Sequence, residues 1–366
     1  MILIGIHFIL HNHPANGRHA SCLARGGSHL LIYAPLVEWS MATNILDNSL
    51  LVECQFAVEE ALESVVESAM SGPYAAAMSL AREILLAGGK RIRPVLTLLA
   101  YDLSGGGNRS EIMDFAVAME LIHTATLVHD DVYDGAKLRR GVQTLHEKYG
   151  LDHAIIGGDF LFVMGFGLGG RYEENIVRIM AETCAAIASG ELKQIQHISD
   201  LSTGPEDYYE IVRGKTAGPF ASACECAAII AGASPAEIQS MRDFGMELGI
   251  AFQLVDDLLD LVGDERMGKA RGTDIHEGKM TLPIIHALTL LHGDARRDLA
   301  EVLENFHEDR WEEIQLLLDQ SSSMAYCRIL IHNHLERALG HLHDFPKSDV
   351  RDVLESMTRQ VMVRNV

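Results

Sequence analysis

Apolar residues recur at three- and four-residue intervals along most of this chain, and this periodicity limits the folds it can adopt. Between residues 50 and 65, one helical face is formed by Leu50, Cys54, Val58, Ala61, Leu62 and Val65. The glycines at 88–89 and 105–107 are expected to end two further helices, and Ser234–Glu237 has the sequence of a helix start with a capping box. No stretch alternates with a two-residue period between hairpin turns, and no 30–45-residue repeat recurs. The sequence therefore predicts an all-α protein made of one large helical bundle.

The composition of the chain predicts a large core and argues against nucleic acid as a partner and against a membrane span. With 366 residues, of which 48% are hydrophobic, the chain can bury a large core. Its formal net charge of −21 argues against nucleic acid as a partner. No run of eighteen or more apolar residues occurs, so we expect no membrane span. The six cysteines show no CxxC pair, and we interpret them as reduced thiols of a cytoplasmic protein.

The first forty residues differ from the rest of the chain. They contain one acidic residue, Glu38, and five of the eighteen histidines. We expect 1–40 to be a disordered or non-native extension, with translation starting at Met41, and 41–366 to form the functional domain.

Three aspartates end a long apolar helix predicted from about Glu111 to Asp134. Asp130 and Asp134 lie about 40° apart around a helix axis, and Asp131 lies about 100° from Asp130. Carboxylates this close to an apolar run repel one another unless cations lie between them. Magnesium fits, because it binds oxygen ligands and keeps waters or substrate phosphates in its shell.

A second aspartate motif has the same spacing. Asp256, Asp257 and Asp260 follow another apolar stretch, residues 248–255. One such motif is common on solvated helix faces. Six carboxylates on two otherwise apolar helices are costly to bury, and cations with a diphosphate would offset that cost.

Basic residues lie beside these acidic motifs. Three cations fall within residues 90–93, a pair follows the first aspartates, and two lysines follow the second motif; the candidates are Lys90, Arg91, Arg93, Arg139, Arg140, Lys269 and Lys279. Any one could be a solvated charge. Together they suggest clamps for diphosphate groups, with guanidinium groups making two-pronged contacts.

These segments resemble, in order, the motifs of the trans-isoprenyl diphosphate synthase (polyprenyl synthetase) family. The resemblance covers about residues 85 to 285 and is carried by GGKRIRP, HTATLVHDDVYDGAKLRRG, GELKQ, RGKTAG and FQLVDDLLD followed by GKARGTDIHEGKMTLP. It implies a helical bundle around a central cavity, of the isoprenoid synthase type. It also implies magnesium-dependent, head-to-tail condensation of isopentenyl diphosphate with an allylic diphosphate, carried out by a homodimer.

The resemblance also implies roles for individual residues. About three magnesium ions would be held by Asp130, Asp131, Asp134, Asp256 and Asp260, with Asp257 as a further candidate. The allylic diphosphate would contact Arg139, Lys215 and Lys269, with Lys279 nearby, and isopentenyl diphosphate would contact Lys90, Arg93, His123 and Arg140. Thr216 and Gln253 would face the developing carbocation; ordinary hydrogen bonding within the core is an equal alternative for these two.

Two small residues before the first aspartate motif bear on the length of the product. Ala125 and Thr126, five and four residues before Asp130, are small, whereas short-chain relatives carry a bulky aromatic group in this zone. We therefore expect a product of about 20 carbons or longer, and within that range of about 20 to 40. Both residues could instead be ordinary packing residues, with the floor supplied by another helix.

Glycines suggest two irregularities in the helices. Gly165, Gly167, Gly169 and Gly170 are expected to interrupt a helix in a region that forms the dimer interface in relatives. Gly214, Gly218 and Pro219 should break or kink the helix around Lys215 and could turn this lysine inward.

Two other classes of protein remain as alternatives. A non-catalytic partner subunit would lose aspartates from one or both motifs, and this chain keeps all six. A terpene cyclase or a head-to-head condensing enzyme would share the first motif but would not need a second diphosphate site. Lys90, Arg93 and Arg140 favour the head-to-tail reaction.

Overall fold

The computed structural model describes residues 48–263 and 271–363. All of them belong to one compact unit. The predictions for residues 1–40, Met41 and Lys269 lie outside the described residues.

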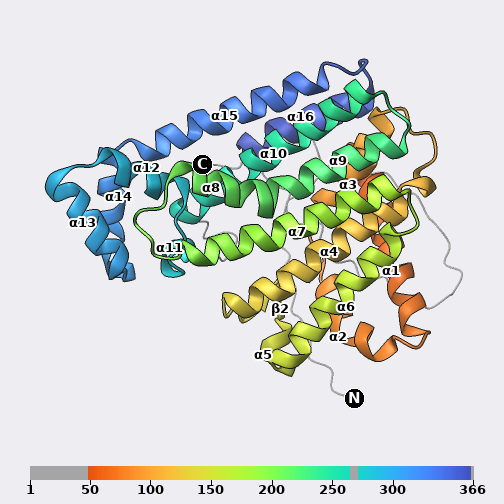
Figure 1. The fold of residues 1–366 in the computed structure, drawn as a ribbon, viewed down its shortest axis with the longest axis horizontal. Helices are drawn as coiled ribbons and strands as arrows, with labels where there is room; N and C mark the ends of the chain where they lie inside the picture. Colours follow the sequence, from red (N-terminus) through yellow and green to blue (C-terminus); the bar gives the residue numbers. More distant parts are fainter. Residues whose placement is uncertain (1–47, 264–270, 364–366) are drawn as a thin grey trace, which may run out of the picture. The chain divides into compact units, whose positions relative to one another are not determined.

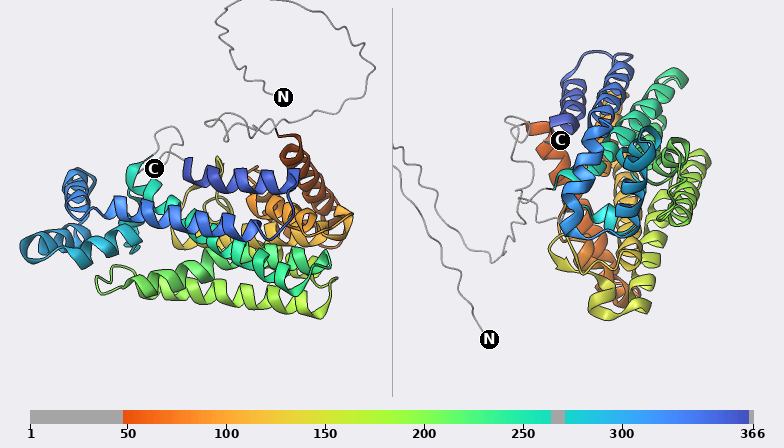
Figure 2. Two further views of the ribbon diagram at one scale, coloured as in Figure 1. Left: turned by 90° about the horizontal axis from the view of Figure 1, so that it is seen from above. Right: turned by 90° about the vertical axis from the view of Figure 1, so that its left-hand side faces the viewer.

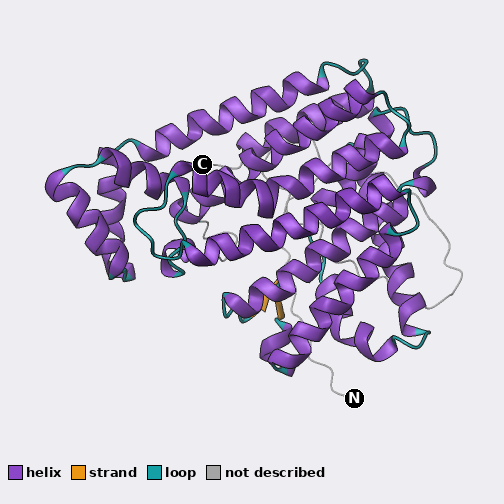
Figure 3. Cartoon of the chain, viewed as in Figure 1, coloured by secondary structure: helices purple, strands orange, loops and turns teal. Residues whose placement is uncertain are grey.

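The described part of the chain is almost entirely helical (Figure 3), which confirms the all-α prediction. A two-residue antiparallel ribbon, Leu138–Arg139 (β1) with Val142–Gln143 (β2), follows the first aspartate motif. The α-helices are α1 Ser49–Met70, α2 Ala75–Leu85, α3 Ile92–Leu103, α4 Met113–Tyr133, α5 Leu145–Tyr149, α6 Leu151–Gly169, α7 Glu174–Gln196, α8 Pro205–Val212, α9 Gly218–Ile230, α10 Pro235–Val262, α11 Thr273–His276, α12 Leu282–Leu290, α13 Gly293–Glu304, α14 Trp311–Gln320, α15 Ser323–Leu342 and α16 Asp349–Val363.

The long helices pack side by side around a common core (Figures 1 and 2). α4 packs along α6, and α10 lies between α9 and α15. The main core takes buried residues from α1 to α10 and from α15 and α16. A smaller core around Trp311 joins α11 to α14 with the end of α10. The aspartates of α4 and α10 are thus carried by two central helices of the main core.

The predicted start of α10 is confirmed in detail. The Glu237 N–H donates to Ser234 Oγ at 3.4 Å, and the Ser234 N–H donates to Glu237 Oε2 at 2.8 Å. Pro235 occupies the first helical position, where its missing N–H costs nothing. These contacts fix where the helix that carries the second aspartate motif begins.

The predicted irregularity around Lys215 is a π-helical turn, Arg213–Ala217, which joins α8 to α9 without a break. The Gly218 N–H donates to the carbonyl of Arg213, five residues earlier. Such turns insert one residue into a helix and often occur at functional sites. This turn carries Lys215 and Thr216.

The predicted interruption of α6 is wrong. The helix runs unbroken through Gly165 and Gly167 and ends at Gly169, with Gly170 as its C-cap. Interior glycines disfavour a helix by about 1 kcal/mol each, but this preference yields to packing. Gly165 meets α4 so closely that an added Cβ would lie 3.1 Å from the Ala118 carbonyl oxygen.

Among the described helices, α6 alone is long and apolar enough to cross a membrane on the criteria of length and composition. The same test is passed by core helices of proteins that span no membrane, so one such helix is weak evidence. One face of α6 packs against α4 within the bundle, and this face includes Leu161 and Gly165.

Candidate active site

A cavity of about 450 Å³ lies between the helices that carry the two aspartate motifs. Its walls come from the loop before α3, from α4, the ribbon β1–β2, α7, the π turn, α9 and α10. Its lining includes Lys90, Arg91, Arg93, Met119, Glu120, Ile122, His123, Thr126, Leu127, Asp130, Arg139, Arg140, Met180, Cys184, Ile187, Lys215, Thr216, Phe252, Gln253 and Asp256. One cavity therefore joins both aspartate motifs, most of the predicted cations and a set of apolar side chains.

In the first motif, Asp130 lines the cavity. Its carboxylate lies 3.8 Å from Lys215 Nζ. Burial, together with the negative charges of Glu191 and Asp134, raises the pKa of Asp130 to about 6, although Lys215 opposes the shift. Asp134 caps the end of α4 and accepts a hydrogen bond from Lys279 Nζ at 3.3 Å.

The middle residue of this motif, Asp131, lies outside the cavity lining and is almost fully buried. The Arg139 guanidinium binds one carboxylate oxygen, with Nε at 2.7 Å and Nη2 at 2.5 Å. The other oxygen, Oδ2, is buried and has no donor among the described residues. A buried acceptor of this kind normally has a partner.

In the second motif, Asp256 lines the cavity, and Asp257 is buried. Asp257 accepts hydrogen bonds from the Tyr208 hydroxyl at 2.6 Å and from Gln253 Nε2 at 2.8 Å. Burial raises the pKa of Asp257 to about 7, although these two donors oppose the shift.

Asp260, the last aspartate of the second motif, is held by backbone groups at the start of α11. It accepts hydrogen bonds from the N–H groups of Thr273 and Asp274, each at 3.1 Å. Burial, and the charges of Asp257 and Asp260, raise the pKa of Asp274 to about 8. Asp274 is thus an acidic neighbour that motif spacing alone did not identify.

The residues of the π turn face both aspartate helices. Lys215 contacts Glu191 and donates to Gln194 Oε1 at 2.9 Å. Thr216 Oγ1 donates to Gln253 Oε1 at 2.8 Å, which extends the chain from Thr216 through Gln253 to Asp257. Glu191 and Gln194 belong to the GELKQ segment, so the motif signalled them, but their roles were not assigned.

Close backbone packing brings the π turn to α7. An added Cβ on Gly214 would lie 2.7 Å from the Ala186 carbonyl oxygen, and one on Gly190 would lie 3.2 Å from the Lys215 nitrogen. A side chain at Gly214 would force the backbone to shift, and one at Gly190 would need its neighbours to move by a few tenths of an ångström. The approach places Lys215 beside Glu191, one residue from Gly190.

The cavity wall that carries Arg93, His123 and Arg140 is basic. Arg93 lies over the Phe220 ring at 5.0 Å, and burial lowers the pKa of Arg93 to about 10. Arg140 Nη1 is buried and finds no acceptor among the described residues. Burial, followed by the charges of Arg93 and Arg140, lowers the pKa of His123 well below 6.5, so this imidazole is neutral at pH 7.

Sequence reasoning gave no role to the buried ion pair behind this wall. Arg91 Nη1 lies 2.6 Å from Glu120, and Arg91 Nε lies 2.8 Å from Glu59. Glu120 also reaches Arg140, at 3.5 Å. A single glutamate in the apolar helix before the first motif was the signal that could have found Glu120.

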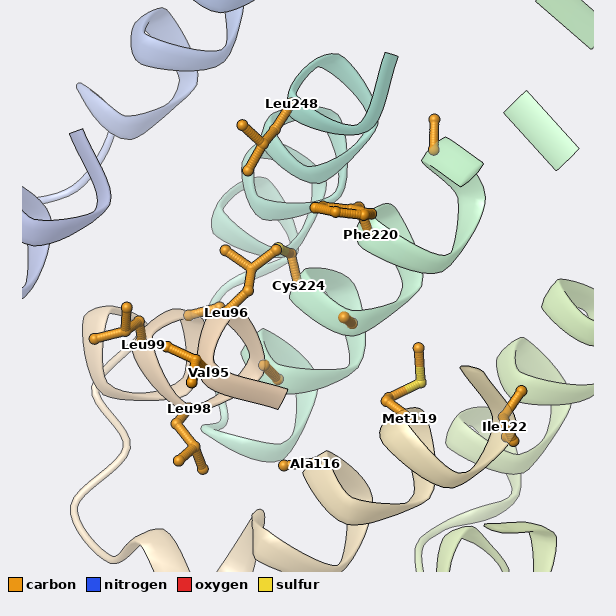
Figure 4. Close-up of a cluster of buried hydrophobic side chains, with 14 of the residues drawn as sticks. Val95, Leu96, Leu98, Leu99, Ala116, Met119, Ile122, Phe220, Cys224 and Leu248 are labelled. Atoms are coloured by element: carbon orange, nitrogen blue, oxygen red, sulfur yellow. The ribbon is translucent and has the colours of Figure 1, made fainter. Parts of the chain in front are cut away.

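The apolar end of the cavity corrects one prediction about product length. Thr126 lines the cavity, but Ala125 is fully buried and is not part of the lining. Successive helical residues point about 100° apart, and here Thr126 faces the cavity while Ala125 points into the core. The face that carries Thr126 continues through Ile122 and Met119, whose side chains project from the same side of α4 in Figure 4.

The carboxylates of the cavity suit magnesium ions that are bound jointly by the protein and the substrate. Among the described residues no three carboxylate, histidine or cysteine groups converge closely enough to hold an ion unaided. Magnesium commonly binds through one or two carboxylates plus substrate phosphates and waters, which suits Asp130 and Asp256 facing one cavity. The raised pKa of Asp130 and the unpartnered oxygen of Asp131 are the features that a cation would compensate.

Comparison with known proteins decides the family. Residues 75–319 match the family model described as polyprenyl synthetase. The chain belongs to the polyprenyl synthetase family. It is 35% identical over 307 residues to the all-trans-nonaprenyl-diphosphate synthase (geranyl-diphosphate specific) of Rhodobacter capsulatus, covering 83% of this chain and 94% of that protein.

Relatives with products of different length are almost equally similar to this chain. A short chain isoprenyl diphosphate synthase of Methanothermobacter thermautotrophicus is 34% identical over 77% of this chain and 88% of that protein. The polyprenyl synthase of Caulobacter crescentus, solved with calcium and isoprenyl diphosphate, has 34% identity and a TM-score of 0.79 over 87% of this chain and 98% of that one. The chain is therefore a prenyltransferase of isoprenoid biosynthesis, with the fold of the isoprenyl diphosphate synthases.

Proposed function

We propose that this polyprenyl synthetase condenses isopentenyl diphosphate with an allylic diphosphate, head to tail, to give a trans-polyprenyl diphosphate of about 20 carbons or longer. The observation that carries the proposal is that Asp130 and Asp256, one from each motif, line one cavity with Arg93, Arg140 and Lys215. A terpene cyclase would not need the basic wall of Lys90, Arg93 and Arg140.

The two diphosphates are assigned to different walls. The allylic diphosphate lies between the aspartates, near Arg139, Lys215 and Lys279, and isopentenyl diphosphate lies against the basic wall. Arg140 Nη1 supports this placement, because a buried guanidinium N–H without an acceptor fits a phosphate oxygen. His123, which lines the same part of the cavity, is neutral at pH 7 and can donate or accept a hydrogen bond there.

Magnesium would be held by Asp130, Asp131, Asp134, Asp256 and Asp260, in about three ions, and would neutralise charge on the departing diphosphate. The allylic carbon–oxygen bond breaks and leaves a carbocation. The double bond of isopentenyl diphosphate attacks this carbocation, a carbon–carbon bond forms, and a proton is lost to the released diphosphate. Thr216 donates its hydroxyl hydrogen to Gln253, so its oxygen lone pairs are directed elsewhere and can stabilise the cation.

We also propose a cytoplasmic homodimer formed through α6. Large apolar side chains on this helix are exposed, with 53% exposure at Leu151, 56% at Ile156 and 69% at Val163. A second copy would bury them. The cysteines that the structure describes are free thiols, which agrees with a reducing compartment.

Product analysis tests the proposal directly. Purified protein is incubated with labelled isopentenyl diphosphate, magnesium and one of three primers, geranyl, farnesyl or geranylgeranyl diphosphate, and dephosphorylated products are separated by chromatography. We expect elongated trans-prenols that disappear when the metal is chelated. Absence of incorporation with all three primers would refute a head-to-tail synthase, and cyclic or head-to-head products would favour the alternative classes.

A further inference from the structure

Two glycines of α6 lie directly behind the apolar wall of the cavity. An added Cβ at Gly169 would lie 2.3 Å from both Sδ and Cε of Met180. One at Gly165 would lie 2.8 Å from Cγ1 of Ile122. Side-chain atoms do not approach one another this closely, so each glycine provides the space that its neighbour occupies.

The two neighbours also line the cavity. Met180 on α7 and Ile122 on α4 are both almost fully buried, with 1% and 4% exposure, and both belong to the cavity lining. Each side chain therefore has a glycine on one side and the cavity on the other. Gly165 and Gly169 are four residues apart, so they lie on one face of α6, one above the other.

We propose that Gly165 and Gly169 are specificity-determining residues, which set the depth of the apolar cavity, and so the length of the product, by letting Ile122 and Met180 draw back toward α6. This inference rests on the proposed function. It assigns a role to glycines that do not touch substrate and that act through the two wall residues.

The physical basis is the density of the interior. A packed core has no room for an extra methyl group unless a neighbour moves, and the neighbour moves into whatever free volume borders it. For Met180 that volume is the cavity, and the flexible thioether can swing there at small cost. At Gly165 the adjacent Ala118 carbonyl oxygen, 3.1 Å from an added Cβ, is backbone, so α6 itself would also shift.

Gly167 provides a matched control on the same helix. An added Cβ there meets nothing within 4 Å. Alanine at Gly167 and at Gly169 makes the same chemical change, and the gain in helix propensity, about 1 kcal/mol in a helix interior, is no larger at Gly169, the last residue of α6. Only the change at Gly169 displaces a side chain that lines the cavity.

The test compares the products of Gly169→Ala, Gly167→Ala and the wild type, made from labelled isopentenyl diphosphate and a farnesyl diphosphate primer. We expect Gly169→Ala to shorten the main product by at least one isoprene unit and to lower the longest wild-type product about tenfold, the discrimination that one methylene group produces in an apolar pocket. Gly167→Ala should leave the distribution unchanged. The double variant Gly169→Ala/Met180→Ala should give products at least as long as those of the wild type, because the displaced thioether is gone.

An unchanged product distribution in folded Gly169→Ala, or failure of the double variant to restore chain length, would overturn the inference. Met180→Ala alone should lengthen the product, and this result is required even if circular dichroism shows that Gly169→Ala does not fold. An unchanged or shorter product from Met180→Ala would then refute the inference. Failure of the proposed function is distinct, since the wild type itself would give no elongated product.

Discussion

The two aspartate motifs have the same spacing but different surroundings. In both, the first aspartate (Asp130 or Asp256) lines the cavity, and the second (Asp131 or Asp257) is buried. The buried residue of α4 is held by a charged guanidinium group, whereas that of α10 is held by a hydroxyl and an amide, both neutral. The position within the motif sets which way the carboxylate points, and the neighbouring elements set how its charge is compensated.

This difference separates two tasks. The cavity-facing aspartates are placed to meet cations and diphosphate. The buried aspartates also fix local structure, in addition to the metal contact proposed for Asp131: Asp131 holds Arg139 of the ribbon β1–β2, and Asp257 holds Gln253, which in turn accepts from Thr216. Four variants in isosteric pairs can test this division.

The largest effect is expected at the cavity-facing pair. Asp130→Asn and Asp256→Asn each keep the side-chain shape and remove a charge that would bind magnesium. We expect either change to lower kcat about a thousandfold, equivalent to several kcal/mol of transition-state stabilisation. The measurement is the initial rate of isopentenyl diphosphate incorporation, with circular dichroism to show that the fold is kept. Rates within tenfold of wild type for both variants would contradict the assignment of these aspartates to the metals.

A smaller effect should separate the two buried aspartates. At pH 8, Asp131→Asn leaves the Arg139 guanidinium without its counter-charge, and we expect the free energy of unfolding to fall by about 2 kcal/mol. Asp257→Asn should cost only about 1 kcal/mol, because the new amide oxygen can accept one bond and the Tyr208 hydroxyl can rotate to accept from the amide. Chemical denaturation in chelator measures both. Equal losses, or a larger loss for Asp257→Asn, would mean that the kind of partner is unimportant.

A further effect is a pH dependence of stability in the metal-free protein. The pKa values of Asp130, about 6, and Asp257, about 7, lie above the ordinary 3.8, so the folded state binds more protons than the unfolded state between these values. Their contribution to stability is present at low pH and is lost as the pH rises through the folded pKa, with a slope of at most about 1.4 kcal/mol per pH unit for each group.

Asp130→Asn and Asp257→Asn should therefore gain stability relative to wild type as the pH rises above about 4, and the gain should level off above about pH 6 for Asp130→Asn and about pH 7 for Asp257→Asn. Denaturation curves at several pH values in chelator provide the measurement. A relative loss of stability with rising pH would show that these carboxylates are already compensated without metal.

Much of the fold and part of the site could be predicted from local sequence. The apolar period predicted the helices, and the aspartate spacing correctly predicted that Asp130 would turn away from Asp131. The partners of Asp131 and Asp257 were not predictable. Tyr208 lies 49 residues from Asp257 in the chain, and no sequence pattern near either residue indicates that they are in contact.

Both wrong predictions, the interruption of α6 and the placement of Ala125, arise because local sequence does not show what packs opposite a residue. Glycines in α6 were interpreted from helix propensity alone, which disregards what lies opposite them; Gly165 is tolerated because Ile122 occupies its space. Ala125 was placed beside the tail by its distance from Asp130 along the chain, but the rotation of the helix directs it into the core.

The single extra residue in the turn Arg213–Ala217 has a consequence for how this segment can change. If the same residues followed ordinary α-helical turns instead of a π turn, residues of α8 would be rotated by about 100° relative to those of α9. Tyr208 and Thr216, which now both reach α10, could not do so together. Deleting one residue here would restore an ordinary α-helix in which the two contacts stay in phase, so the π turn is what allows a segment with one added residue to present both side chains to α10.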